Sequence, residues 1–127
     1  MLEYREDPIN KIVELNIDGF VPRDDFNEVI KALELRIKEW GKLKLIKIVH
    51  DFDGFDPRIL VDDIKFGLNH YKDFSHVALV SDKKWAQKLA EVFAPLYPCP
   101  IKLFEEDDLD DAREWLKSMN PPKDKSL

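Results

Sequence analysis

Apolar and polar residues alternate in two segments near the start of the chain, which is the pattern of half-buried β-strands. The segments cover residues 2–5 and 13–18, and Asp7 and Pro8 supply a turn between them. The apolar positions are Leu2, Tyr4, Val13, Leu15 and Ile17. This spacing predicts an antiparallel hairpin with one face exposed to water.

The spacing then changes to that of an amphipathic helix. The apolar positions with helical spacing are Phe26, Val29, Ile30, Leu33, Ile37 and Trp40. Gly41 follows them and is a candidate for a left-handed C-terminal cap. The pattern predicts a helix from Arg23 or Asp24 to Trp40.

Three strand patterns and three helical patterns alternate over the rest of the chain. The strands are predicted at residues 43–49, 76–80 and 101–104. The first of these is almost continuously apolar, as expected for a strand that is covered on both faces. The order of elements, ββαβαβαβα, predicts an α/β fold with a mostly parallel sheet and an antiparallel N-terminal hairpin at its edge.

Helix starts are predicted where Asp or Ser can cap free amide groups. They fall at Asp56-Pro57, at Ser81 or Asp82, and at Asp107 or Asp108, and Pro95 closes the second helix. The residues expected to face inward are Leu60, Ile64, Leu68 and Tyr71, then Ala86, Leu89, Ala90 and Phe93, then Leu109, Ala112 and Leu116. We expect one domain over residues 1–119 and a flexible tail at residues 120–127.

Composition narrows the class of protein. Apolar residues make up 44% and charged residues 36% of the 127 positions, which is typical of a globular domain. No apolar run approaches the ~20 residues that span a bilayer, and the N-terminus lacks a secretory signal pattern, so we expect a cytoplasmic location. The net charge of −6 comes without a basic stripe, which argues against nucleic-acid binding. The single cysteine, Cys99, excludes an internal disulfide and is interpreted as an apolar filler.

An acidic and aromatic turn, predicted at residues 50–56 after the central strand, is the sharpest candidate site. Residues 51–54, DFDG, match the DxDG of haloacid-dehalogenase-type phosphatases, in which an aspartate attacks phosphorus. Phosphate donors and magnesium ligands would come from Ser81, Lys83 or Lys84, and Glu105 to Asp108. Such enzymes begin with this strand, whereas a hairpin and a helix precede it here, and Phe55 stands where they carry threonine or valine. A magnesium-dependent phosphotransferase is therefore the remote alternative.

The simpler interpretation is structural. Asp51 and Asp53 turn the chain, Gly54 supplies a permissive backbone, and Phe52 and Phe55 pack. A calcium loop is excluded because its glycine stands sixth, whereas Gly54 is the fourth residue of the motif.

The three histidines, His50, His70 and His76, lack the i, i+4 spacing of a shared metal site. His70 is expected near the carbonyl end of a helix, where a proton is favoured. The sequence thus predicts neither a metal nor a cofactor.

The segments DFDGFD, DIKFGLNH and HVALVSD, a tryptophan in the following helix and a closing AREWL together resemble the SpoIIAA-like family of small STAS/Sec14-type bacterial domains. The residues that carry the resemblance are Asp51, Phe52, Gly54, Phe55, Asp63, Lys65, Phe66, Gly67, His70, Val77, Val80, Asp82, Trp85, Ala112, Trp115 and Leu116. The match runs from about Val13 to Leu116. It implies a β/α superhelical fold shared with anti-sigma-factor antagonists and Sec14-type lipid-binding domains, and it implies no catalytic residues. The serine that the antagonists phosphorylate has no counterpart between Asp53 and Pro57.

We therefore expect a non-enzymatic binding or regulatory module. A carrier of a small apolar or lipid-like ligand is the alternative, so the partner is either a protein or a small apolar molecule, and the sequence leaves the oligomeric state open. The candidate binding residues are Phe52, Asp53, Phe55, Lys65, His70, Asp82, Trp85 and Phe93.

Overall fold

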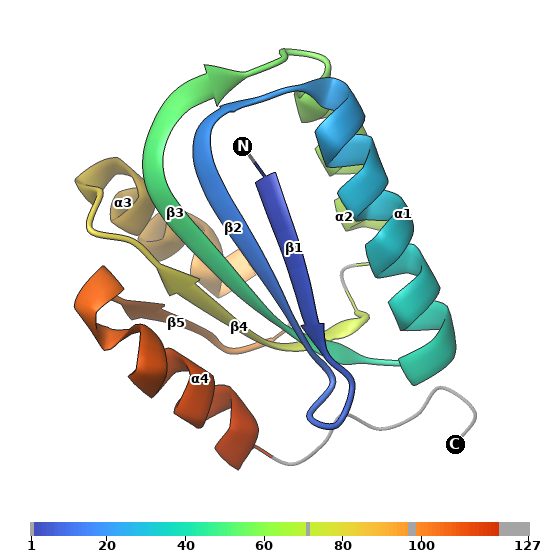
Figure 1. Ribbon diagram of the computed structural model, residues 1–127, viewed down its shortest axis with the longest axis vertical. Helices are drawn as coiled ribbons and strands as arrows, with labels where there is room; N and C mark the ends of the chain where they lie inside the picture. Colours follow the sequence, from blue (N-terminus) through green and yellow to red (C-terminus); the bar gives the residue numbers. More distant parts are fainter. Residues whose placement is uncertain (1, 71, 97–98, 120–127) are drawn as a thin grey trace.

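Five strands form one mixed sheet, in which they lie in the order in which they follow along the chain (Figure 1). The computed structural model describes residues 2–70, 72–96 and 99–119. The strands are β1 (Leu2–Asp7), β2 (Ile12–Val21), β3 (Leu43–Phe55), β4 (Phe74–Val80) and β5 (Ile101–Phe104). The helices are α1 (Arg23–Trp40), α2 (Ile59–His70), α3 (Lys84–Phe93) and α4 (Leu109–Ser118), with short 3-10 turns η1 (Ala94–Leu96) and η2 (Glu106–Asp108).

The pairing of the strands confirms the predicted sheet. β1 runs antiparallel to β2, with Tyr4 opposite Leu15, and the neighbouring pairs from β2 to β5 are all parallel. A tight turn suffices for the antiparallel pair, whereas each parallel pair needs a crossover that returns the chain to the same end of the sheet. The helices α1, α2 and α3 supply these crossovers.

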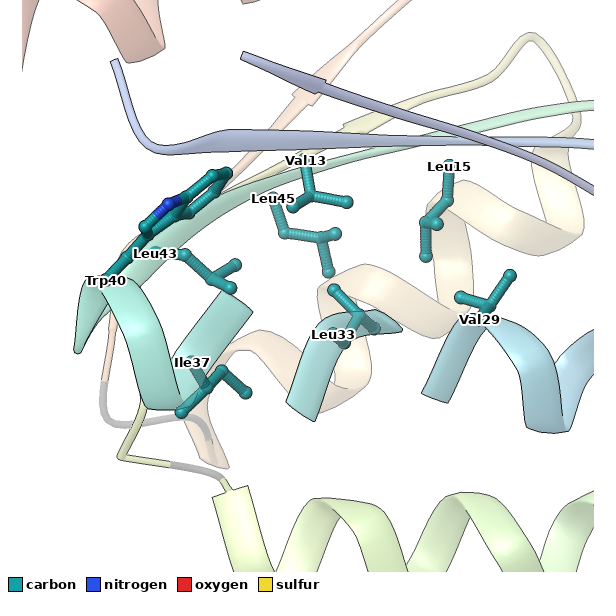
Figure 2. Packing of buried hydrophobic residues seen from close by; sticks show 8 residues of the cluster. All are labelled: Val13, Leu15, Val29, Leu33, Ile37, Trp40, Leu43 and Leu45. Carbon is teal, nitrogen blue, oxygen red and sulfur yellow. The ribbon is translucent and has the colours of Figure 1, made fainter. Parts of the chain in front are cut away.

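One core cluster lies between α1 and the face of the sheet covered by odd-numbered residues of β2 and β3 (Figure 2). Its buried members are Val13, Leu15, Val29, Leu33, Ile37, Trp40, Leu43 and Leu45. The period of two along the strands and of 3.6 along the helix brings these side chains onto facing surfaces. The predicted ends of this helix are also confirmed. Gly41 has the positive φ, 82°, that favours glycine, but its ψ of −119° lies outside the left-handed helical region that was predicted.

A second cluster lies on the opposite face of the sheet, beneath α4. Its buried members are Ile12, Ile46, Ile48, Ala78, Val80, Ala112 and Leu116. The expectation that the hairpin keeps one face in water holds for β1, where Glu3 and Arg5 are exposed, but fails for the start of β2, because Glu14 lies under this helix. Its carboxylate accepts hydrogen bonds from Nε and Nη2 of Arg113 at 2.7 and 3.2 Å, a bidentate pairing that satisfies the charge at the helix–sheet boundary.

Lys44 of β3 is a buried lysine that ties α4 to the sheet. Its side chain is 1% exposed, and its Nζ donates a hydrogen bond to the carbonyl oxygen of Leu116 at 2.7 Å. The last carbonyls of a helix lack partners within the helix and carry a partial negative charge, so an ammonium group is favoured there. Burial nevertheless lowers the pKa of Lys44.

β3 continues to Phe55, although the sequence predicted a turn at residues 50–56. The extension pairs with the end of β2 as Gly19 with Phe52, Phe20 with Gly54 and Val21 with Phe55. The register shifts on both sides of Gly19, and φ is 78° at Gly19 and 107° at Gly54, values that glycine adopts without strain. Both strands curve strongly at this end in Figure 1. The acidic and aromatic segment is thus a curved strand end, because β2 offers it a pairing partner.

The predicted cap before α2 is present, since the Asp56 carboxylate accepts a hydrogen bond from the backbone N–H of Arg58 at 2.9 Å, but the helix begins at Ile59, two residues after the predicted Pro57. The residues expected on its inner face, Leu60, Ile64, Leu68 and Tyr71, lie outside the side chains that the structure describes. The proposed tail at residues 120–127 is also outside the described residues. Cys99 is buried, and burial raises the pKa of its thiol, as expected for a packing residue.

Candidate binding surface along helix α3

Two aromatic candidates from the sequence meet where β3 ends and α3 begins. The ring centroids of Phe52 and Trp85 are 5.3 Å apart, and the ring planes are tilted by 43°. Phe52 is half-buried, whereas Trp85 is 45% exposed. Offset and tilted ring pairs are favoured aromatic contacts, so Phe52 supports the indole ring while much of Trp85 stays open to solvent.

The apolar surface continues from Trp85 along α3. Leu89 is 50% and Val92 is 65% exposed, and together with Trp85 they have the i, i+4, i+7 spacing that aligns side chains along one side of a helix. We call these three residues the α3 stripe. Ala86 is only 4% exposed and faces inward as predicted, but the prediction that Leu89 faces inward is wrong. The apolar side chains of α3 therefore extend further around the helix than the part that the rest of the fold buries.

Charged side chains connect the strand ends beside the α3 stripe. Nζ of Lys83 lies 3.0 Å from Oδ1 of Asp51, and this interaction raises the pKa of Lys83. Nδ1 of His50 contacts the carboxylate of Glu106, and the backbone N–H of Glu106 donates to Oδ1 of Asp82 at 2.9 Å. These contacts link the extension of β3 with the segments that follow β4 and β5.

Ser81 holds the end of β3 against the loop before α3. It is 1% exposed; its hydroxyl donates to the carbonyl oxygen of Val49 at 2.9 Å and accepts from the backbone N–H of Lys83 at 3.1 Å. Both interactions are with the backbone, so the hydroxyl acts here as a structural bond between two segments. Within residues 2–70, 72–96 and 99–119, no three His, Cys, Asp or Glu side chains form a group that could hold a metal ion.

His70 lies away from the α3 stripe. α2 leads back from the carboxyl end of β3 to the amino end of β4, so its last residue, His70, lies at the opposite end of the sheet from Trp85. There Nδ1 of His70 lies 2.9 Å from Oδ2 of Asp73, and its ring stacks on Phe66 with centroids 4.8 Å apart. These contacts serve the junction between α2 and β4.

Four other candidates remain. Asp53 is exposed on the β3 extension, and Lys65 is exposed on α2. The side chains of Phe55 and Phe93 lie outside the part of the chain that the structure describes. The structure thus brings together Phe52, Trp85 and the nearby Asp82, while the exposure of Leu89 and Val92 was not predicted from the sequence.

The phosphotransferase alternative grouped Asp51, Lys83 and Glu105 to Asp108 at one site, but the pairs of His50 with Glu106 and of Asp51 with Lys83 were not predicted. The signal for them is that these residues follow the parallel strands predicted at residues 43–49, 76–80 and 101–104, whose carboxyl ends share one edge of the sheet.

A surface hollow of about 570 Å³ lies elsewhere, between β5 and α4. Its lining includes Phe104 and Trp115 together with charged side chains of Lys102, Asp111 and Glu114. Nζ of Lys102 lies 5.2 Å from the centre of the Phe104 ring and 5.7 Å from that of Trp115, so the lysine already covers both rings. Of the proposed binding residues whose side chains the structure describes, none lines this hollow.

A mixed five-stranded sheet with helices packed on both faces makes the protein an α/β domain. The chain belongs to the SpoIIAA-like family, whose sequence model matches residues 12–117. The resemblance carried by the sequence motifs is therefore confirmed.

A solved structure supports the same fold. An uncharacterized protein from the DUF3478 family of Shewanella loihica PV-4, with a SpoIIAA-like fold, superposes with a TM-score of 0.73. The two chains are 22% identical, and the alignment covers 91% of this chain and 92% of the other. At this identity the comparison shows a shared fold and carries no information on activity. No curated protein matches the chain. Among the described helices, none is both long enough and apolar enough to cross a membrane.

Proposed function

We propose that the protein is a non-enzymatic module that binds another protein through the α3 stripe. The observation that carries this proposal is the exposure of Trp85, Leu89 and Val92 along one side of a single helix. Isolated apolar side chains are normal on a surface, whereas a contiguous patch is characteristic of interaction sites. Trp85 strengthens the argument, since tryptophan is enriched among the residues that dominate protein interfaces.

The contacts around the stripe also support a binding role. Phe52 packs against Trp85, and Ser81 bonds β3 to the loop before α3, so the stripe is attached to the sheet by side-chain contacts. A partner that meets a preformed surface loses less conformational entropy on binding than one that must order it.

A selection experiment tests this proposal. Peptides selected from a random display library on the full chain are expected to shift the backbone amide signals of residues 84–93 in NMR spectra. The Leu89→Ser variant is expected to lose these peptides, because it removes the centre of the apolar stripe. Leu35→Ser is the matched control, since Leu35 is 59% exposed on α1, away from the stripe. Peptides that bind both variants equally would show that the stripe is not the binding site.

The non-enzymatic part of the proposal has its own test. We expect no hydrolysis of para-nitrophenyl phosphate above background in the presence of magnesium, because the Ser81 hydroxyl, a phosphate donor in the phosphotransferase alternative, is already held by two backbone groups. A rate that the Asp51→Asn variant abolishes would contradict the proposal and favour the phosphotransferase.

A carrier of a small apolar ligand is the second candidate, favoured by the indole of Trp85 beside Phe52. Native mass spectrometry of the freshly purified chain distinguishes the two. A small molecule that is retained by the wild type and lost on Trp85→Ala would favour the carrier.

A further inference from the structure

The charges beside the α3 stripe are unevenly distributed. At about 100° per residue, Trp85, Leu89 and Val92 fall within an arc of about 60°, and Lys88 and then Lys84 follow on one side of it. Both lysines are exposed. In a chain of net charge −6, these lysines place two positive charges beside the first two turns of α3, and Glu91 follows on the same side at its last turn.

We propose that the α3 stripe docks an amphipathic helix of a partner protein that carries acidic residues beside its apolar side. The inference rests on the proposed function, since it specifies the chemistry of the partner at the same surface. Acidic residues of the partner would pair with Lys84 and Lys88, while its apolar residues cover Leu89 and its two neighbours in the stripe.

The geometry of the stripe favours a helix as the occupant. α3 has 10 residues, so it offers a straight ridge about 15 Å long. Such a ridge of i, i+4, i+7 side chains fits the groove between corresponding rows on a second helix. An extended strand would need backbone donors and acceptors, which the side of a helix does not offer.

A membrane surface fits this region less well than a protein does. Asp51, with a side chain 83% exposed, lies near the Trp85 end of the stripe, and the exposed Glu91 lies on its last turn. Anionic headgroups would repel these carboxylates together, whereas a folded partner can place a separate group opposite each one.

A second copy of the chain is also disfavoured by charge. Antiparallel pairing of two α3 helices about a two-fold axis brings each side of the helix against the same side of its copy. Lys88 lies near the middle of the helix and beside the stripe, so it would approach Lys88 of the second copy. This like-charge contact opposes self-association.

The test is a competition between peptide flanks. A display library contains helical peptides of about 18 residues, which is long enough to form a helix on a surface. Each peptide carries apolar residues at i, i+3, i+4 and i+7, and the positions beside this apolar side, here called its flanks, are drawn from Glu, Gln and Lys. The full chain is the bait. We expect Glu flanks to be enriched about tenfold over Lys flanks at low ionic strength, with the preference falling as salt is added.

Variants of the bait identify the source of the preference. Lys84→Glu/Lys88→Glu is expected to reverse it towards Lys flanks. Lys31→Glu/Lys38→Glu changes two exposed lysines of α1 by the same charge and is expected to leave it unchanged. Leu89→Ser is expected to remove binding of all flank types. Circular dichroism checks that each variant is folded.

The outcomes separate the two proposals. Binders that require Leu89 but show no flank preference would overturn the proposal of an acidic helical partner, while the proposal that the α3 stripe is a binding surface would still hold. An absence of binders, or binders that are unaffected by Leu89→Ser, would overturn both. Sedimentation of the wild type with phosphatidylserine-containing vesicles would assign the stripe to membranes, and a concentration-dependent dimer abolished by Leu89→Ser would assign it to a second copy. Either result would overturn the acidic helix.

Discussion

Truncation of Leu89 to alanine measures how much of α3 the fold buries. Leu89 lies in the middle of the proposed binding surface and is 50% exposed, whereas Leu33 of α1 is 3% exposed within the core shown in Figure 2. The two residues occupy equivalent positions in their sequence patterns, since both lie on the apolar side of an amphipathic helix. Their truncations should nevertheless differ in cost, because only one of them creates an internal cavity.

The expected magnitudes follow from exposure. Full burial of a leucine side chain stabilises a protein by about 1.5–3 kcal/mol, so the half of Leu89 that is buried contributes about 1 kcal/mol. Water fills the space left at the surface, and alanine has the higher helix propensity, so little is added to this loss. Leu33→Ala removes a fully enclosed side chain and should cost about 3–4 kcal/mol through lost transfer free energy and a residual cavity.

Urea unfolding monitored by circular dichroism gives the free energy of unfolding of each variant, provided that the slope of that free energy against urea concentration stays the same as in the wild type. Leu35→Ala serves as the matched control, because Leu35 is 59% exposed on the same helix as Leu33. We expect Leu89→Ala to lose about as little stability as Leu35→Ala. A loss close to that of Leu33→Ala would show that Leu89 is packed inside, and the binding surface would lose its central residue.

Three further predictions concern polar groups. Burial lowers the pKa of Lys44 in the folded state, so the unfolded state binds more protons near the usual lysine pKa. Raising the pH towards that range should therefore stabilise the wild type relative to Lys44→Met, as measured by urea unfolding. Parallel pH profiles of the two proteins would refute this. Hydrogen bonds from Arg58 lower the pKa of Asp56 to about 2, so the stabilisation from this carboxylate is present above its usual pKa of 3.8 and is lost as the pH falls towards 2. Arg58→Ala should raise this pKa in an NMR titration of the carboxyl carbon, and an unchanged value would show that the pair does not persist in solution. Ser81→Ala should cost about 1–3 kcal/mol of unfolding free energy, because it leaves buried backbone groups without a partner, and a loss below about 0.5 kcal/mol would mean that water replaces the hydroxyl.

The sequence alone determined the kinds of elements and their order. Period-two alternation defined the hairpin of β1 and β2, and the spacing from Phe26 to Trp40 defined α1 and its buried side. These features follow from local geometry, because the direction of a side chain along a helix or strand depends only on its position in that element. Family motifs spread over most of the chain added the SpoIIAA-like fold.

Only the tertiary structure decided which of these surfaces are covered. Glu14 sits on a strand face that the alternation marked as wet, yet Arg113, 99 residues further along the chain, reaches it from α4. The segment at residues 50–55 became strand because the end of β2, bent at Gly19, lies beside it.

The candidate site shows the same division. The motifs indicated Phe52 and Trp85, but their contact and the outward side of α3 emerged only from the structure. Leu33 and Leu89 have similar neighbours in sequence, and burial separates them because it depends on which distant element packs against each helix. An apolar pattern predicts which side of a helix would be favoured in the core, whereas the packing of the whole fold decides whether another element covers that side. On α3 the neighbouring elements cover only part of the apolar side, and the stripe therefore stays exposed.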